Sequence, residues 1–263
     1  MKYGFIGCGN MGSAVAYALS KNTVDFAVTD RSGKANATAQ SIGCKYTDIN
    51  TIARECENIF LCVKPQMMGD MLAGISEILK EKKPVLITMA AGLTTEKICE
   101  MAGVQLPVIR IMPNTPVLLG KGIVLYCGNQ LVSEEQLNDF VSDLSHAGQL
   151  DYLPETLFDA ATSLTGCGPA YAYMFIDALA DGAVSCGVPR KKAIEYAANV
   201  LIGAAEMVLS TEEHPAKLKD NVCSPGGSTI AGVRALEQKG FRGAVVDCII
   251  AANEKNKELG KIN

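Results

Sequence analysis

The sequence predicts an α/β amino-terminal domain with a mostly parallel, doubly wound sheet, followed by an all-α carboxyl-terminal domain. Short apolar runs alternate with helix-like segments up to about residue 155, and the first of them leads through a glycine-rich turn into a helix. After Pro154 the apolar runs become long and rich in alanine. Strands that alternate with helices are typical of a parallel sheet with helices on both faces.

The amino-terminal domain is predicted to span residues 1–155. Its apolar runs predict strands at 2–6, 24–29, 44–46, 59–63, 85–89, 107–112, 123–127 and 149–153. The segments between them predict helices near 11–20, 34–41, 50–56, 67–81, 94–102 and 133–146. Ser133 with Gln136 forms a capping-box pattern, and Thr94 precedes an acidic first turn, so two of these helices have clear starts.

Residues 156–263 are predicted to be all helical. The runs at 169–179 and 193–202 are too long for strands, and two more helices are predicted near 229–239 and 242–259. Because these helices are apolar around most of their circumference, the domain is expected to pack against a second subunit. The alternative is a self-contained bundle that packs on the first domain.

The composition is that of a soluble globular protein. Of the 263 residues, 48% are hydrophobic and 20% are charged, and the net charge is −4 without a basic run. An acidic chain of this kind is not expected to bind nucleic acid. No apolar run approaches the length of a membrane span, and the first residues do not resemble a secretory signal, so we expect a cytoplasmic protein without a membrane partner.

Ten cysteines raise the question of disulfides or a bound metal. None forms a Cys-x-x-Cys pair, and the chain has only two histidines, His146 and His214. Most of the cysteines lie inside apolar runs, as Cys62 does. We therefore predict small buried thiols and no metal site.

The opening residues predict a binding site for a dinucleotide. They read as a strand, a Gly-x-Gly-x-x-Gly turn and the start of a helix, which is the context this fingerprint requires. Gly7 permits the turn, Gly9 lets the backbone approach a pyrophosphate, and Gly12 lets the helix pack closely on the strand. Unpaired amides at the start of the helix would hold the anion in such a Rossmann-type domain. The predicted contacts are Gly7, Gly9, Asn10, Met11 and Gly12. A purely structural turn is the alternative.

The residues after the second predicted strand give conflicting signals about the cofactor. Asp30 lies about where an acidic residue binds the ribose hydroxyls of NAD. Arg31, Ser32 and Lys34 are instead donors that suit the 2′-phosphate of NADP. We predict that Asp30, Arg31 and Ser32 contact the cofactor and favour NADPH, with NADH as the second possibility. A polar turn without a ligand is the alternative.

Two more predicted strands end in residues that suggest a ligand site. Val63–Lys64–Pro65–Gln66 stops one strand at a lysine and a proline, and two prolines fix the backbone around Asn114 and Thr115. Ligands of open parallel sheets bind beyond the carboxyl ends of strands, so both segments are candidates for a ligand site. Rigid turns are the alternative.

Two glycine-rich turns, Thr165–Tyr171 and Ser224–Thr229, lead into predicted helices. Exposed amides at a helix start suit an anion, and the hydroxyls of Ser224, Ser228 and Thr229 add donors without adding charge. This environment suits a substrate carboxylate.

The same region is poor in bases. Neither histidine lies beside a glycine-rich turn at a strand end, and the helix after Pro169 has no lysine before Arg190. Oxidation of an alcohol needs a group that takes the hydroxyl proton. A protonated cyclic imine needs only hydride and orientation, so the pocket favours reduction of a C=N bond.

Taken together, these motifs resemble those of pyrroline-5-carboxylate reductases. They follow the family's order and span nearly the whole chain: Gly7-x-Gly9-x-Met11-Gly12, Val63–Lys64–Pro65–Gln66, Met112–Pro113–Asn114–Thr115–Pro116, Gly166-x-Gly168–Pro169–Ala170–Tyr171 and Ser224–Pro225–Gly226–Gly227. The resemblance implies reduction of 1-pyrroline-5-carboxylate to L-proline by NAD(P)H, the last step of proline biosynthesis. It also implies a Rossmann domain followed by a helical domain that interlocks with a second subunit, with dimers often assembling further, for example into a ring.

The resemblance further implies the substrate site. Thr229 corresponds to the family's hydroxyl near the ring nitrogen and is the predicted catalytic residue. The predicted substrate contacts are Ser224, Gly226, Gly227, Ser228 and Thr229. Among them, the amides of Gly226, Gly227 and Ser228 would receive the carboxylate. Three residues depart from the family's pattern: Thr165 and Cys167 stand where two serines are usual, and Ser228 stands where threonine is frequent. Cys167 is the poorer donor, so substrate affinity could be lower here.

The resemblance also implies the remaining contacts with the cofactor, which are Val63, Lys64, Pro65, Ala91, Gly92 and Asn114. Lys64 and Pro65 would border the nicotinamide ribose, and Asn114 would orient the cofactor. Ala91–Gly92 would lie beside the nicotinamide ring.

Two other functions are alternatives to the reduction of 1-pyrroline-5-carboxylate. A 3-hydroxyacid dehydrogenase of similar plan would need a catalytic lysine, and residues 169–189 contain none. A protein that binds a dinucleotide without turnover would not need the second glycine cluster. Glu212 and His214 either border the active site through a partner subunit or form a solvated turn.

Overall fold

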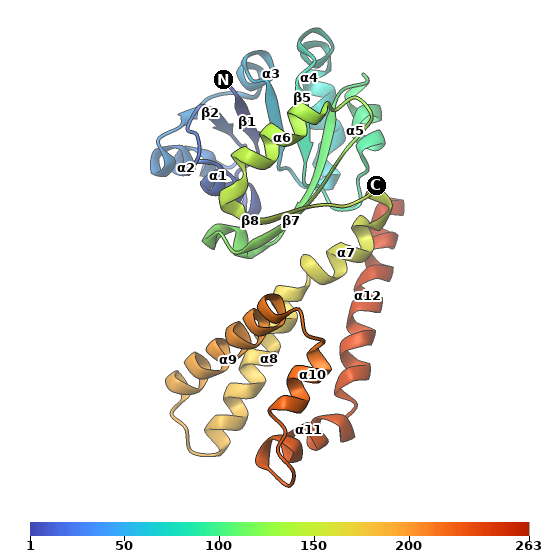
Figure 1. The fold of residues 1–263 in the computed structure, drawn as a ribbon. Helices are drawn as coiled ribbons and strands as arrows, with labels where there is room; N and C mark the ends of the chain where they lie inside the picture. The colour runs from blue at the N-terminus through green and yellow to red at the C-terminus, as the bar shows by residue number, and fades with distance from the viewer. Residues whose placement is uncertain (263) are drawn as a thin grey trace. The chain divides into compact units, whose positions relative to one another are not determined.

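The computed structural model describes residues 1–262, and the chain divides into two compact units. The sheet unit comprises Met1–Cys167 and Ala252–Asn263, and the helical unit comprises Gly168–Ala251 (Figure 1). The domain boundary near residue 155 coincides with the end of the last strand and stays a prediction. Residue 263, the expected end of the helical domain, lies outside the described residues.

An eight-stranded sheet forms the centre of the sheet unit, in the order β3-β2-β1-β4-β5-β6-β7-β8. Its strands are β1 (Tyr3–Ile6), β2 (Phe26–Thr29), β3 (Lys45–Tyr46), β4 (Asn58–Leu61), β5 (Val85–Thr88), β6 (Val108–Pro113), β7 (Gly122–Gly128) and β8 (Gly148–Tyr152). All neighbouring strands are parallel except β6 and β7. The predicted fold class is therefore confirmed. The strand order reverses between β1 and β4, and ligands of open sheets bind beyond the carboxyl ends of such strands.

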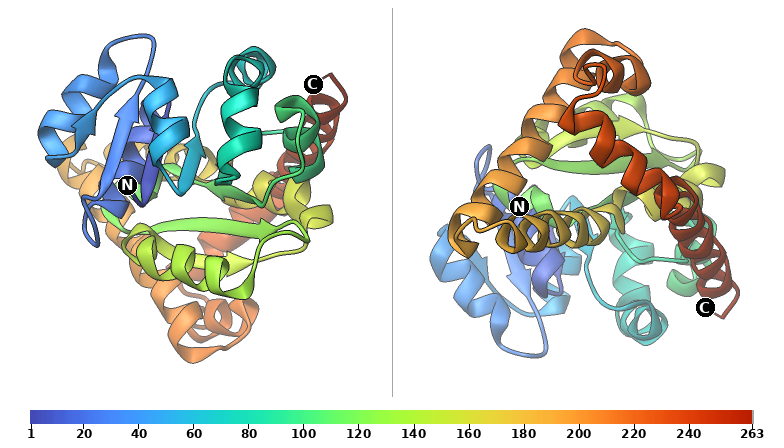
Figure 2. Two further views of the ribbon diagram at one scale, coloured as in Figure 1. Left: turned by 90° about the horizontal axis from the view of Figure 1, so that it is seen from above. Right: turned by 90° about the horizontal axis from the view of Figure 1, so that it is seen from below.

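Helices cover both faces of this sheet. They are α1 (Asn10–Leu19), α2 (Lys34–Ile42), α3 (Ile49–Glu55), α4 (Met68–Lys82), α5 (Thr95–Ala102) and α6 (Glu134–Asp143), with short 3₁₀ helices at Pro65–Met67, Thr115–Leu119, Ser145–Ala147 and Glu155–Leu157. One buried cluster joins the strands to α1, α2 and α6, and a second joins them to α3, α4 and α5. The view from above in Figure 2 shows α6 and α4 on opposite sides of the strands.

The two faces explain why the strands read as continuous apolar runs. Phe5 and Phe60 stack in the first cluster with ring centroids 4.3 Å apart, whereas Ile59 and Leu61 belong to the second. Alternate side chains of one strand thus enter different cores, as expected for a parallel sheet buried on both faces.

The predicted helix starts agree with the structure, but one helix end does not. Ser133 forms the capping box with Gln136, and the Thr94 hydroxyl accepts the Lys97 amide at 3.1 Å. The helix predicted over 133–146 ends at Asp143. There the Asn22 side chain donates to the Asp143 carbonyl at 2.8 Å. This contact spans 121 residues, so no local pattern could reveal it.

A buried arginine connects the sheet to α7 (Phe158–Thr165). The sequence analysis does not predict α7 as a separate helix. The Arg110 side chain on β6 is only 3% exposed and bonds Glu155 at 3.2 Å. Its guanidinium also lies 4.8 Å from the ring centroid of Phe158. Glu155 in turn accepts from the amide and hydroxyl of Thr95 at 2.8 and 2.9 Å. The carboxylate of Glu155 therefore satisfies groups of two different segments, β6 and the start of α5.

The helical unit contains α8 (Gly168–Ser185), α9 (Arg190–Thr211), α10 (Pro215–Asn221), α11 (Ser228–Gln238) and the first half of α12 (Phe241–Ile262). The seven-residue α10 is missing from the sequence-based prediction because it lies in a polar stretch. Helices α8 and α9 lie side by side (Figure 1). Within the described residues, the three hydrophobic clusters include none from this unit, and its buried side chains are Ala180, Ala193 and Ala197.

Most large apolar side chains of the helical unit are consequently exposed. On α9 alone they include Ile194, Tyr196, Val200, Ile202, Met207 and Leu209. Contrary to the expectation that no apolar run has the length of a membrane span, the same helix is long and apolar enough to cross a membrane, with a mean hydropathy of 1.3. It is the one such helix in the described part of the chain, and a single helix of this kind is weak evidence for a span.

Replacement of Glu155 by alanine tests the role of the buried arginine. Glu155→Ala should lower the free energy of unfolding by about 2–3 kcal/mol, because Arg110 and Thr95 lose a shared partner. Urea denaturation would measure this change. Glu77→Ala is the control, since it removes only an exposed pair with Lys80 and should cost less than about 0.5 kcal/mol. Equal losses in both variants would contradict the assignment.

Candidate active site

The glycine turn after β1 has the geometry that a dinucleotide requires. Gly7 has a positive φ of 105°, which L side chains rarely adopt. A Cβ at Gly12 would clash with the Gly7 carbonyl oxygen, so only glycine lets α1 approach so closely. Around Gly9 there is open space, with no atom within 4 Å of an added Cβ. Gly9 is also the N-cap of α1 and no side chain caps this helix, so its first amides are open to an anion.

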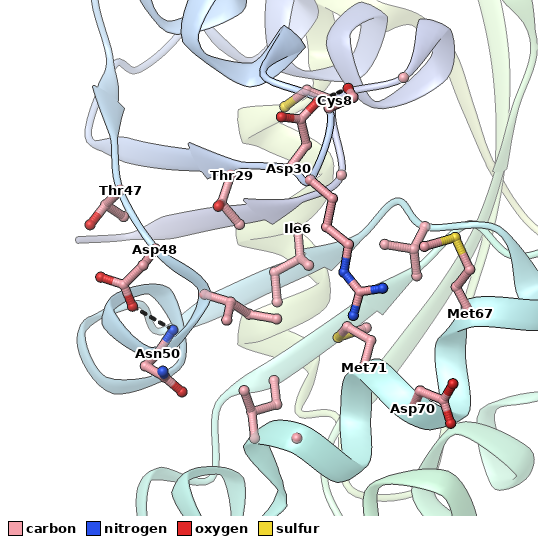
Figure 3. A pocket seen from close by; sticks show the side chains of 18 of the residues that line it. Ile6, Cys8, Thr29, Asp30, Thr47, Asp48, Asn50, Met67, Asp70 and Met71 are labelled. Atoms are coloured by element: carbon pink, nitrogen blue, oxygen red, sulfur yellow. Dashed lines mark hydrogen bonds between the residues drawn. The ribbon is translucent and has the colours of Figure 1, made fainter.

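A cavity of about 1070 Å³ adjoins this turn at the carboxyl edge of the sheet (Figure 3). Seven of the predicted cofactor residues line it: Gly7, Gly9, Asp30, Arg31, Ser32, Val63 and Lys64. They follow the ends of β1, β2 and β4, which are neighbours in the sheet although distant in the chain. The structure thus brings together the three segments that the sequence singles out separately.

Asp30 offers this cavity an acceptor that the protein leaves open. Its Oδ1 atom is buried and has no hydrogen-bond partner, whereas Oδ2 accepts the Ser32 hydroxyl at 2.7 Å. A buried acceptor without a partner is costly, so a ligand hydroxyl would be well placed to satisfy it. Burial raises the pKa of the neighbouring Cys8 thiol to about 12, so this lining group stays neutral. The residues present therefore fit a dinucleotide.

Several lining residues are absent from the sequence-based prediction. Thr47, Asp48 and Asn50 follow β3, and Met67 and Asp70 lie at the start of α4. Asp48 caps α3 by accepting the amides of Asn50 and Thr51 at 2.9 and 3.0 Å. Because β3 has only two residues, its end is hard to recognise in the sequence. Ligands nevertheless bind beyond the carboxyl ends of parallel strands, and these residues follow such an end.

The other predicted cofactor residues lie outside the cavity lining. They are Asn10, Met11, Gly12, Pro65, Ala91, Gly92 and Asn114. Asn114 is 7% exposed, and both ends of its amide are engaged. Its Oδ1 accepts the Ile123 amide and its Nδ2 donates to the Thr165 carbonyl, both at 2.9 Å. In this structure Asn114 braces the end of α7, and its role toward a cofactor stays a prediction.

The predicted substrate residues form a tight turn at the start of α11 in the helical unit. Gly226 has a positive φ of 69°, and the Gly227 amide donates to the Ser224 carbonyl at 3.0 Å. Gly227 is the N-cap of α11 and no side chain caps the helix. The amide of Gly227 is therefore used by the turn, whereas those of Ser228 and Thr229 belong to the first turn, which lacks intrahelical acceptors.

Metal ligands do not gather in the part of the chain that the structure describes. Among residues 1–262, no group of three histidine, cysteine, aspartate or glutamate side chains is arranged to hold an ion. All ten cysteines are free thiols; four are buried, five are half-buried and Cys186 is exposed.

Comparison with known proteins identifies the family. Residues 155–259 match the model described as pyrroline-5-carboxylate reductase dimerisation, and residues 2–92 match that of NADP oxidoreductase, coenzyme F420-dependent. The pyrroline-5-carboxylate reductase of Escherichia coli is 38% identical over 266 residues, which cover 99% of this chain and 98% of the relative. The chain belongs to the pyrroline-5-carboxylate reductase family. The pyrroline-5-carboxylate reductase of Pisum sativum is 37% identical, and the match covers 97% of this chain and 95% of the relative.

Solved pyrroline-5-carboxylate reductases have the same fold throughout. The Plasmodium falciparum enzyme, crystallised with NADP bound, has a TM-score of 0.90 at 34% identity and covers 99% of this chain and 98% of its own. The Coxiella burnetii enzyme has a TM-score of 0.89 at 30% identity, with 98% of each chain covered. The 3-hydroxyisobutyrate dehydrogenase of Mycobacterium tuberculosis has a TM-score of 0.51 at 11% identity, and the match covers 67% of this chain and 64% of that chain. This is a likeness in fold alone.

Two glycine substitutions separate cofactor binding from folding in this reductase-family chain. Gly9→Ala should leave the free energy of unfolding within about 0.5 kcal/mol of the parent, because its Cβ enters open space. The same methyl group occupies the expected place of the pyrophosphate, so affinity for NADP⁺ should fall at least tenfold, or about 1.4 kcal/mol.

Gly12→Ala should instead destabilise the fold itself, because its Cβ clashes with backbone. Thermal melting and calorimetric titration would measure both quantities. Unchanged NADP⁺ affinity in the Gly9 variant would refute the assigned position of the pyrophosphate.

Proposed function

We propose that this chain reduces 1-pyrroline-5-carboxylate to L-proline with NADPH, and accepts NADH, as the last step of proline biosynthesis. The observation that carries this proposal is the turn Ser224–Thr229, which forms an uncapped helix start in a member of the pyrroline-5-carboxylate reductase family. The cavity beside the glycine turn supports the proposal, since its open amides and unpaired acceptor suit a dinucleotide.

The sheet unit holds the cofactor. Amides at the start of α1 bind the diphosphate, and Asp30 with Arg31 binds the adenosine ribose and its 2′ substituent. Lys64 and Pro65 border the nicotinamide ribose, and Ala91–Gly92 borders the ring. A bound nicotinamide supplies the hydride, and none of these side chains is required to move a proton.

The helical unit holds the substrate. The amides of Ser228 and Thr229 face an anion with the positive end of the α11 dipole, and they bind the carboxylate. The Thr229 hydroxyl accepts a hydrogen bond from the N–H of the protonated imine and thereby orients the imine carbon. Orientation of this kind contributes up to roughly 7–11 kcal/mol in well-aligned reactions, which a site without a general base needs.

The active form is a homodimer joined through the helical unit, and the protein works in the cytoplasm. The helical unit contributes no residue to the described hydrophobic clusters and exposes its large apolar side chains, so its stability requires a partner of matching surface. The family model that matches residues 155–259 is described by dimerisation. Assembly of dimers into a larger ring is the further expectation.

The substrate is tested by NADPH oxidation with two compounds. Purified protein should oxidise NADPH rapidly with 1-pyrroline-5-carboxylate and not with succinic semialdehyde. The reverse preference would favour a 3-hydroxyacid dehydrogenase. Tight binding of NADPH without turnover of either compound would favour a dinucleotide sensor.

The role of Thr229 is tested by removal of its hydroxyl. Thr229→Val should lower kcat/KM for 1-pyrroline-5-carboxylate about 10–100-fold, because one hydrogen bond to the reacting ring is lost. Thr229→Ser keeps the hydroxyl and serves as the control, with a much smaller loss. Steady-state kinetics with unchanged values for the valine variant would remove Thr229 from the mechanism.

The dimer surface is tested by charge substitution at two equally exposed leucines. Leu209 on α9 is 78% exposed in the single chain, and Leu119 in the sheet unit is 79% exposed. Leu209→Asp should weaken the dimer at least tenfold, because a charge replaces buried apolar contact. Leu119→Asp should leave it intact. Analytical ultracentrifugation would show both, and a dimer of unchanged strength in the Leu209 variant would contradict the proposed surface.

A further inference from the structure

The carbonyl of Thr165, at the end of α7, has no amide to bind where a continuing helix would offer one. In an α-helix this oxygen accepts the N–H four residues later, and that residue here is Pro169, which has no N–H. The Asn114 side chain supplies the bond instead, since its Nδ2 donates to the Thr165 carbonyl at 2.9 Å. A side chain that lies 51 residues away in the chain thus replaces a backbone donor.

The surroundings of Asn114 fix its amide for this bond. The residue is 7% exposed, and its Oδ1 accepts the Ile123 amide of β7 at 2.9 Å. An asparagine often caps the helix that follows it, but the side chain of Asn114 does not cap the 3₁₀ helix Thr115–Leu119. It bridges β7 and α7, so the local sequence gives up a cap for a contact between distant segments.

The bridge lies beside the boundary of the two compact units. The chain passes from the sheet unit to the helical unit after Cys167 and returns at Ala252. At the first passage α7 leads through a short break into α8 (Figure 1). At the second, Asn256 of α12 donates to the Asp159 carbonyl at 3.1 Å and to the Ser163 hydroxyl at 3.2 Å. Asparagine side chains therefore bind α7 near both passages.

We propose that Asn114 is a positioning residue that fixes the junction of α7 and α8, and with it the helical unit that carries the substrate turn. The two motifs Met112–Pro116 and Thr165–Tyr171 then act together, because Pro169 leaves a carbonyl open and Asn114 fills it. This inference rests on the proposed function, since it assumes that hydride transfer needs the substrate turn held in place.

Kinetics and calorimetric titration separate this role from a direct contact with the cofactor. Asn114→Ala should lower kcat for 1-pyrroline-5-carboxylate about tenfold or more, because orientation is lost. The dissociation constant of NADP⁺ should change less than about threefold, because Asn114 does not line the cavity. Asn114→Asp, which keeps an acceptor for Ile123 but loses the amide donor, should behave in the same way. An unchanged kcat, or an equal loss of NADP⁺ affinity, would overturn the proposal.

Pro169→Ala tests the pairing of the two motifs, because it returns an N–H to the position that lacks one. In this background the loss of Asn114 should matter less. Asn114→Ala should raise the equilibrium constant for unfolding, measured by urea denaturation, about fivefold more in the parent than in the Pro169→Ala variant. Equal effects in the two backgrounds would overturn the proposal.

Asn129→Ala is the matched control. Asn129 directly follows β7 and also uses both ends of its amide, with Oδ1 accepting the Val108 amide at 3.2 Å and Nδ2 donating to the Leu106 carbonyl at 2.8 Å. Its loss should destabilise the fold but change kcat less than about threefold.

A fall in kcat as large as that of Asn114→Ala would reveal a general effect of lost stability and would overturn the proposal. Wild-type protein that does not reduce 1-pyrroline-5-carboxylate would instead refute the proposed function. The comparison of unfolding in the Pro169→Ala background would still test the bond between the two motifs.

Discussion

The close packing of α1 on the turn after β1 is the constraint on which the rest of the sheet unit depends. Gly12 approaches the Gly7 carbonyl so closely that no side chain fits between them. This contact fixes the direction of α1 and leaves its first amides facing the carboxyl edge of the sheet. Because β1 lies between β2 and β4, the same edge also presents Asp30 and Lys64. One backbone contact therefore positions the open amides of α1 beside two other predicted cofactor contacts.

A second constraint acts on the helical unit. Its buried side chains are alanines, which let α8 and α9 approach closely but remove little apolar surface from water. Under our proposal, the surface that remains is the dimer interface, so folding and assembly of this unit are one process. The turn at Ser224–Gly227 begins α11 in that same unit. The proposed substrate site thus depends on the association of two chains for its rigidity.

The sequence predicts most of the fold because its signals are local. Apolar runs, glycines and the Ser133 cap predict the strands, the first turn and a helix start that the structure confirms. What it misses depends on long-range contacts, such as the bond from Asn22 that helps to end α6. The same holds for the candidate site. Strand ends predict seven lining residues, but only the folded chain reveals that Asn114 braces α7 and that Ser32 donates to Asp30.

A 3-hydroxyisobutyrate dehydrogenase partly shares the fold of this chain, so the fold alone does not identify the substrate, and our proposal assigns the substrate to the turn before α11. We propose that main-chain amides at two helix starts hold both ligands. A crystal structure with L-proline and NADP⁺ tests it most directly. We expect the proline carboxylate on the amides of Ser228 and Thr229 and the diphosphate at the start of α1. Density for either ligand at any other place would contradict it.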